Sequence, residues 1–177
     1  MSLGPAPTIA LPQPGWSMRA WCDEDVPHLA LAANDERILQ WMSDTWPSPY
    51  TEGDAWWWIA TGQHQAGTSW AVCLDDVPRG GVGLHPQQGF LRCNVEVGWW
   101  LHPDHWGLGV APAAAAQLLE RAFALPEVTR VFAPIHTGNT RSESVARKIG
   151  MRLEGVQPRS AFKRGQVIDR LTYAAYR

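Results

Sequence analysis

The sequence has few cysteines, no long hydrophobic run and no cluster of positive charge. Its three cysteines, Cys22, Cys73 and Cys93, are an odd number without CxxC spacing. They argue against a disulfide framework and a thiolate zinc site, and they favour a reducing compartment. No apolar run approaches the ~20 residues that a membrane span needs, and the N-terminus lacks the charged and apolar regions of a signal peptide. We therefore expect a cytoplasmic protein with no membrane partner.

Charged residues are also sparse, at 18% of the chain, and the formal net charge is −2. Without a basic cluster the chain has no electrostatic footprint for nucleic acid, so no nucleic-acid partner is expected. A negatively charged ligand has to be held by local geometry, because the chain as a whole does not attract anions.

Hydrophobic residues, by contrast, make up 45% of the 177 residues, and the chain contains 11 tryptophans. This length and composition are typical of one soluble globular domain. Four prolines crowd residues 4–15, so we expect residues 1–15 to form an extended arm with little regular structure. Residues 16–177 are expected to form the domain itself. Both a monomer and a homodimer are compatible with the sequence.

The spacing of hydrophobic residues predicts a mixed α/β fold with a central, largely antiparallel sheet. The order is strand, helices, three strands, helix, strand, helix and two strands. The expected strands are 18–21, 69–74, 80–84, 90–101, 129–135, 151–156 and 166–173. The expected helices include 23–42, with a break near Asn34-Asp35, and 108–125. Two more are expected, one capped by Thr51 with Asp54 and one that begins at Asn139 or Thr140 and ends at Gly150.

The turn Gly107–Ala111 lies between the longest expected strand and a long amphipathic helix. Its glycines allow a close approach of the backbone to a ligand. The first N–H groups of the helix and the helix dipole favour an anion there, and a pyrophosphate suits that geometry. A bare GxG spacing also occurs in tight turns that bind nothing, so the spacing alone predicts only an anion site.

Residues 99–111 resemble motif A of the GNAT N-acetyltransferases, Q/R-x-x-G-x-G/A. Gly109 and Ala111 match the motif, and Trp106 replaces the Gln or Arg, as in the RimJ/RimL-like branch of ribosomal-protein N-terminal acetyltransferases. Two further stretches are similar to that branch, which has N-x-x-S…K-x-G-F followed by G-x-x-x-D. They are Asn139–Ser142 with Lys148–Met151, where Met151 replaces Phe, and Gly165 with Asp169. The resemblance covers roughly residues 17–175.

The resemblance implies a GNAT-like sheet in which two splayed parallel strands, 90–101 and 129–135, form a cleft for acetyl-CoA. Pro134, which has no backbone N–H, suits a strand that stops pairing there. The cofactor-binding residues implied are Trp100, Leu101, His102, Gly107, Leu108, Gly109, Val110, Ala111 and Asn139.

Acyl transfer to an amine needs a neutral amine, and an alkylammonium has a pKa near ~10, so a base helps at neutral pH. Glu96 is the leading candidate, although it is equally readable as an exposed or salt-bridged strand residue, or as a contact for the substrate's ammonium group. Many family members carry a Tyr as general acid where this chain has Ala146. Ser142 is then the candidate proton donor to the leaving thiolate, with a purely helix-capping role as the alternative.

The remaining aromatic and imidazole groups are less specific. Trp46, Trp56 and Trp57 lie where this family builds its substrate wall, and a packing role is as compatible with the sequence. No metal site is expected, because His102 and His105 have no third ligand nearby in the sequence. These two histidines are expected to border the cofactor, and His136 is expected on the surface or in a loop.

Together these observations predict an acyl-CoA-dependent N-acetyltransferase. It would move an acetyl group from acetyl-CoA to a primary amine by direct attack in a ternary complex. The acceptor is either a protein or peptide N-terminus or a small-molecule amine. One alternative is a non-catalytic acyl-CoA-binding module, and another is an interaction protein that uses its tryptophan surface and binds no CoA.

Overall fold

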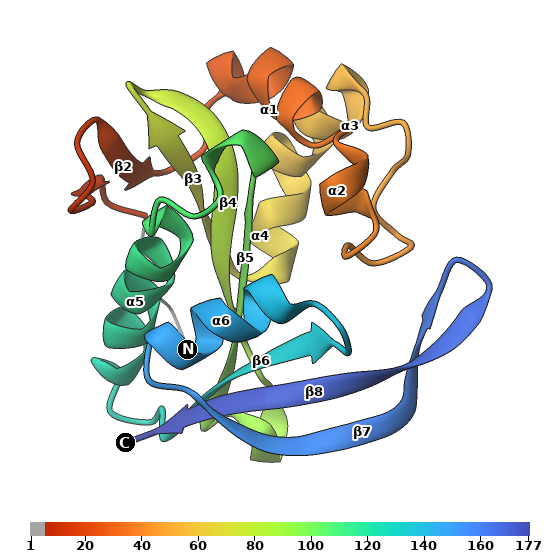
Figure 1. Ribbon diagram of the computed structural model, residues 1–177. Helices are drawn as coiled ribbons and strands as arrows, with labels where there is room; N and C mark the ends of the chain where they lie inside the picture. Colours follow the sequence, from red (N-terminus) through yellow and green to blue (C-terminus); the bar gives the residue numbers. More distant parts are fainter. Residues whose placement is uncertain (1–5) are drawn as a thin grey trace.

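The structure, a computed structural model, describes residues 6–177 (Figure 1). Residues 1–5 of the expected arm lie outside the described residues. The strands are β1 (Ile9–Ala10), β2 (Trp16–Arg19), β3 (Thr68–Leu74), β4 (Val77–Pro86), β5 (Asn94–Leu101), β6 (Arg130–His136), β7 (Arg152–Lys163) and β8 (Gln166–Tyr176). The helices are α1 (Val26–Ala32), α2 (Glu36–Leu39), α3 (Glu52–Trp57), α4 (Gln63–Ala66), α5 (Val110–Phe123) and α6 (Thr140–Lys148). Short 3-10 turns occupy Asp23–Asp25, Gly89–Leu91 and Pro103–His105, and a π-helical turn, Trp58–Gly62, joins α3 to α4.

The strands form one eight-stranded sheet in the order β1-β2-β3-β4-β5-β6-β8-β7. Every neighbouring pair is antiparallel except β5 and β6, which run parallel. This confirms the predicted mixed, largely antiparallel sheet with one parallel pair.

The parallel pair is short. Its register runs only from Asn94 opposite Arg130 to Glu96 opposite Phe132. Beyond that point β5 keeps its pairing with β4 as far as Leu101, and β6 keeps its pairing with β8 as far as His136. The two strands therefore separate towards their C-terminal ends, as predicted, and Pro134 lies in the separated part.

Helices cover both faces of the sheet (Figure 1). On β3, Trp70 and Val72 belong to the core beneath α5, whereas Ala71 and Cys73 belong to a second core beneath α1 and α3. This alternation follows from the two-residue period of a strand. On α5, the predicted apolar stripe is buried at Val110, Ala114, Ala115, Leu118 and Ala122.

Several strand boundaries differ from the prediction. The first strand of the expected domain lies at Trp16–Arg19 rather than 18–21, and the strand expected at 80–84 extends over Val77–Pro86. β5 begins at Asn94 rather than residue 90, because Gly89–Leu91 form a 3-10 turn and Phe90 points to solvent. β7 and β8 are longer than expected because they pair with each other as a hairpin. Within the expected arm, Ile9 and Ala10 pair with β2, so the arm contains a short strand.

The predicted breaks and caps of the N-terminal helices are confirmed. The amide of Asn34 donates to the carbonyl oxygens of Ala30 and Tyr50, and Asp35 then caps α2 by accepting from the N–H of Arg37. Thr51 and Asp54 form the capping box that begins α3. These bonds fix the course of the segment between α2 and α3, which borders the site described below.

A buried ion pair joins β2 to the first helical turn. The guanidinium of Arg19 donates to both carboxylate oxygens of Asp25, at 2.7 and 2.9 Å, and Asp25 is only 2% exposed. Arg19 also donates to the side chain and carbonyl of Asp76 in the turn between β3 and β4. This pair therefore holds the helical layer against the sheet.

Replacing Arg19 should destabilise the protein strongly, because it leaves a buried carboxylate without a partner. We expect Arg19→Met to lower the free energy of unfolding by about 3–5 kcal/mol in urea denaturation. The matched control is Arg37→Met, which removes a half-exposed arginine that pairs with Asp35 and Asp104. That change should cost about 0–1 kcal/mol, and equal losses in the two variants would contradict this account.

Candidate functional site

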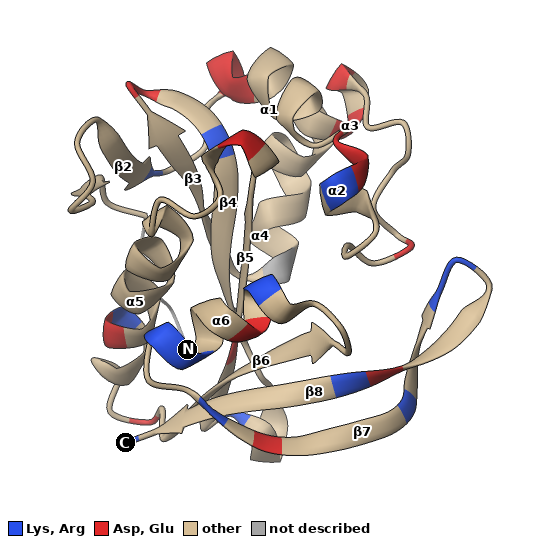
Figure 2. Ribbon diagram, viewed as in Figure 1, with Lys and Arg blue, Asp and Glu red and all other residues tan. Residues whose placement is uncertain are grey.

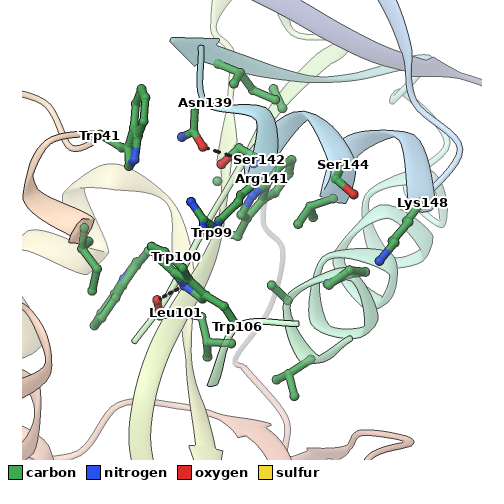
Figure 3. A pocket seen from close by; sticks show the side chains of 18 of the residues that line it. Trp41, Trp99, Trp100, Leu101, Trp106, Asn139, Arg141, Ser142, Ser144 and Lys148 are labelled. Carbon is green, nitrogen blue, oxygen red and sulfur yellow. Dashed lines mark hydrogen bonds between the residues drawn. The ribbon is translucent and has the colours of Figure 1, made fainter. Parts of the chain in front are cut away.

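A cleft of about 380 Å³ opens where β5 and β6 separate. Its walls come from residues 97–101 of β5, residues 133–136 of β6, the loop that leads into α5, the exposed face of α6 and the segment that follows α2. Figure 3 shows tryptophan side chains on one wall and the polar side chains of α6 on the other. The cleft thus combines an aromatic surface with polar and cationic groups.

The glycine turn predicted from the sequence forms one edge of this cleft. Gly107 and Gly109 have φ values of 82° and 78°, a region that residues with a side chain rarely adopt. Gly109 is the N-cap of α5, so the N–H groups of Val110 and Ala111 belong to the unpaired first turn of the helix. Ala111 lines the cleft with both glycines.

Trp106 ties this turn back to β5. Its indole Nε1 donates to the carbonyl oxygen of Leu101 at 2.7 Å (Figure 3). The guanidinium of Arg141, from α6, lies 4.6 Å from the centre of the Trp106 ring, which is within the range of a cation–π contact. Trp106, which lies in the turn, therefore contacts both β5 and α6 and holds these three parts of the cleft together.

The first turn of α6 carries two of the predicted residues. The side-chain oxygen of Asn139 accepts a hydrogen bond from the N–H of Ser142 at 3.2 Å, so Asn139 caps the helix as predicted. Both side chains line the cleft. Arg141, Ser144 and Lys148 lie on the same side of the helix and line it too.

The opposite end of the cleft has an apolar wall and an imidazole. Ile38 lines it from α2, Trp41 and Met42 line it from the segment after α2, and His136 lines it from the end of β6. The placement of His136 corrects the expected surface or loop position, since its Nδ1 is buried and has no hydrogen-bond partner within the described residues. Burial lowers the pKa of His136. Lys163 and Arg170 act in the same direction, and Asp44 opposes them.

The charges on the wall are of one sign. Arg141 and Lys148 line the cleft, and no Asp or Glu of residues 6–177 does so. His105 also lines it, and burial followed by the charge of Arg79 lowers the pKa of His105, which favours a neutral imidazole. The wall is therefore suited to an anionic ligand.

The structure brings most of the predicted cofactor-binding residues together. Those that line the cleft are Trp100, Leu101, Gly107, Gly109, Val110, Ala111 and Asn139. His102 and Leu108 do not line it. His102 points towards Asp35, with 3.9 Å between its Nε2 and the carboxylate, and Leu108 is 55% exposed.

Of the two predicted catalytic residues, Ser142 lines the cleft and Glu96 does not. Glu96 lies at the last paired position of β5 and β6, opposite Phe132 on one side and His85 on the other. The alternation of β5 places it on the sheet face that carries Gly98 and Trp100. Gly98, two residues further along, is part of the wall.

The predicted substrate wall is only partly near the cleft. Trp46 packs edge-on against Trp100, with 5.7 Å between ring centres, and so supports a lining residue from behind. Trp56 and Trp57 are 59% and 52% exposed and do not line the cleft. Within residues 6–177 no helix is long and apolar enough to cross a membrane, and no group of three potential metal ligands is found.

The family model of the acetyltransferase (GNAT) domain matches residues 17–152. The chain belongs to the GNAT acetyltransferase family. An acetyltransferase of this family uses an acyl-CoA donor, and the cleft between β5 and β6 lies within the matched region. The GNAT fold predicted from motif A is therefore confirmed.

Known proteins agree with this assignment. The chain is 25% identical over 114 residues to the uncharacterized N-acetyltransferase YoaA of Bacillus subtilis, covering 63% of this chain and 64% of YoaA. RimL, a ribosomal L7/L12 α-N-protein acetyltransferase solved with coenzyme A, has a TM-score of 0.82 at 20% identity over 96% and 98% of the two chains. RimJ of Mycobacterium smegmatis, solved with CoA-disulfide, has a TM-score of 0.83 at 22% identity over 97% and 86%. The sequence alignments of this chain with its curated relatives cover only 42–64% of the length of each relative.

Sequence reasoning missed several lining residues of this GNAT cleft. Arg141, Ser144 and Lys148 follow i, i+3 and i+7 spacing, a helix-face signal that was available in the sequence. Trp41 and His136 carried no comparable signal, because their place in the cleft depends on contacts between distant segments.

Asn139 gives a direct test of the α6 cap. Asn139→Ala should lower the free energy of unfolding by about 1 kcal/mol, because the N–H of Ser142 loses its acceptor. Asn139→Asp should keep most of that stability, since a carboxylate accepts the same bond and suits the helix N-terminus. Urea denaturation of both variants measures the difference, and equally unstable variants would show that Asn139 does not act as a cap.

Proposed function

We propose that this protein is an N-acetyltransferase that moves an acetyl group from acetyl-CoA to a primary amine in a ternary complex. The observation that carries the proposal is the cleft at the parting of β5 and β6, edged by the Gly107–Ala111 turn and lined by cationic α6 side chains. The sequence similarity to RimJ and RimL supports a place in that branch. The unpaired cysteines support a cytoplasmic location.

The residues of the cleft fit acetyl-CoA. The first N–H groups of α5 lie at the Gly107–Ala111 turn, and unpaired N–H groups at a helix N-terminus suit a pyrophosphate. Arg141 and Lys148 supply positive charge on the facing wall. The edge of β5 that β6 leaves unpaired near Trp100 and Leu101 offers backbone groups to the amide arm of the cofactor, apart from the Leu101 carbonyl, which already accepts from Trp106. Asn139 offers its side-chain amide N–H, since its oxygen is already used by Ser142.

Acetyl-CoA supplies an acetyl thioester, which an amine attacks at the carbonyl carbon while the C–S bond breaks. In our proposal Glu96 takes the proton of the acceptor amine, directly or through a water molecule. Its side chain lies on the face of β5 that looks towards α1 and α3, beside the point where the strands part. Glu96 lies outside the cleft wall, so a bridging water suits its position better than direct contact.

Ser142 is proposed to donate a proton to the sulfur that leaves. Its backbone N–H is held by Asn139, and its hydroxyl makes no hydrogen bond to another described residue. A thiol has a pKa near ~8.5, so the leaving group needs only modest assistance. In this proposal the cap fixes the backbone of Ser142, and the free hydroxyl supplies that assistance.

A non-catalytic acyl-CoA-binding module is the second candidate, and the position of Glu96 outside the cleft wall favours it. Both candidates predict CoA binding, and only the enzyme releases free CoA in the presence of an amine. The acceptor is proposed to be a protein or peptide N-terminus or a small amine, and the protein a monomer or homodimer.

Gly109→Glu tests the cofactor site. The substitution puts a carboxylate where the pyrophosphate is proposed to lie, and like charges in contact cost several kcal/mol, so CoA affinity should fall about a hundredfold or more. Gly150→Glu is a matched control, because Gly150 also has a positive φ, 85°, but lies at the far end of α6 outside the cleft. Calorimetric titration with CoA should show wild-type affinity for the control, and a folded Gly109 variant with wild-type affinity would rule out this site.

Glu96→Gln tests the base. A positioned base contributes about 10²–10⁴-fold, so turnover at neutral pH should fall by that factor, while CoA affinity should not change. The loss should shrink as pH rises towards the pKa of the amine, because a neutral amine needs no base. Glu127→Gln, at an exposed position outside the cleft, is the control. Full activity of the Glu96 variant across the pH range would exclude Glu96 as the base.

A further inference from the structure

The wall that α6 contributes to the cleft carries two cations at a distance from each other. Arg141 and Lys148 both line the cleft, and seven positions of an α-helix extend about 10 Å along its axis. Figure 2 shows positive positions towards both ends of α6. The guanidinium of Arg141 lies over the Trp106 ring, next to the glycine turn, whereas Lys148 is the last residue of the helix. The two charges are therefore offered to different parts of a ligand.

The N-terminal end of α5, on the other side of the cleft, has few free donors. Pro112, the third residue of the helix, has no N–H, and the N–H of Ala113 already donates to the carbonyl oxygen of Gly109 at 3.1 Å. Val110 and Ala111 are thus the helical residues whose N–H groups can meet a ligand. Two such donors at a helix N-terminus suit one pyrophosphate, so a second anionic group of the same ligand needs a different partner.

Ser144 and Lys148 have the properties of such a partner. They lie one turn apart on the same face of α6, and both line the cleft. Figure 3 shows their side chains on the side of Arg141 that is away from Trp41. Within residues 6–177 Lys148 forms no ion pair, and the side-chain hydroxyl of Ser144 forms no hydrogen bond. A free ammonium and a free hydroxyl can both donate to the oxygens of one phosphate.

We infer that Ser144 and Lys148 form a subsite for a phosphate monoester, and that this subsite binds the 3′-phosphate on the ribose of CoA. The inference rests on the proposed acetyl-CoA site and names the residues that distinguish CoA from 3′-dephospho-CoA. CoA carries its negative charge in two places, on the pyrophosphate and on the ribose 3′-phosphate, which matches the two separated cations of α6. A phosphate monoester has a second pKa of about 6 and carries almost two charges at neutral pH, so it is the group of CoA that responds most to a nearby ammonium.

Two ligands that differ only in the 3′-phosphate test this inference. The full chain is titrated by calorimetry with CoA and with 3′-dephospho-CoA. The wild-type protein should bind CoA about 5- to 10-fold more tightly, the effect of a hydrogen bond between charged groups reduced by solvent exposure. Lys148→Gln should remove this preference by weakening the binding of CoA alone, and Ser144→Ala should reduce it in part. Arg141→Gln should weaken both ligands by a similar factor, because both contain the pyrophosphate.

Two further variants separate a local contact from a general effect of charge. Arg147→Gln removes the same charge from the same helix, but Arg147 lies outside the cleft wall and is paired with Glu143 at 2.7 Å, so the preference for CoA should remain. Lys148→Arg keeps the charge and should also keep the preference.

Three results would overturn the inference while leaving the proposed acetyl-CoA site intact. They are equal wild-type affinities for the two ligands, an equal loss of both ligands in Lys148→Gln, and a loss of preference in Arg147→Gln as large as that in Lys148→Gln. A folded wild-type protein that binds neither ligand would overturn the acetyl-CoA site and the phosphate subsite together.

Discussion

The site depends on one interruption of hydrogen bonding, the parting of β5 and β6 after three paired positions. If β5 and β6 stayed paired along their whole length, their backbone N–H and C=O groups would bond to each other and no cleft would open between them. Here each strand remains held by its outer neighbour, β4 or β8, so the inner edges separate without loss of order. Pro134 cannot donate a hydrogen bond from its backbone, and Trp106 takes the carbonyl of Leu101. Both features remove groups that would otherwise rejoin the strands.

The parting also connects the two layers of helices. Val97 and Trp99 belong to the side of the sheet covered by α5, whereas Trp100 packs on the side covered by α1 and α3. A ligand between the strands therefore meets α5 and α6 at one end of the cleft and the segment after α2 at the other. Because the two ends are built from different layers, one end is suited to an anionic donor and the other is free to select an acceptor.

Local signals in the sequence predicted the features that depend on neighbouring residues. The capping box of Thr51, the cap at Asn139, the glycine turn before α5 and the order of strands and helices all follow from short spacings. His136 and Trp41 were not predicted to line the cleft, because their positions follow from the pairing of β6 with β8 and from the course of the chain after α2. The expected start of β5 at residue 90 was wrong, because Gly89 adopts a positive φ and the chain forms a turn there instead of an extended strand.

Local placement also explains how a chain with a net charge of −2 presents a cationic cleft. Its acidic residues are used elsewhere: Asp25 is buried against Arg19, and Glu143 is bonded to Arg147 and the hydroxyl of Tyr173. Arg141 and Lys148 have no carboxylate within ion-pair distance among the described residues and remain available on the wall. In a partly enclosed site with low-dielectric walls, such nearby charges act more strongly than the same charges in water. The field that a ligand meets in the cleft is therefore set by a few unpaired cations and not by the overall charge of the protein.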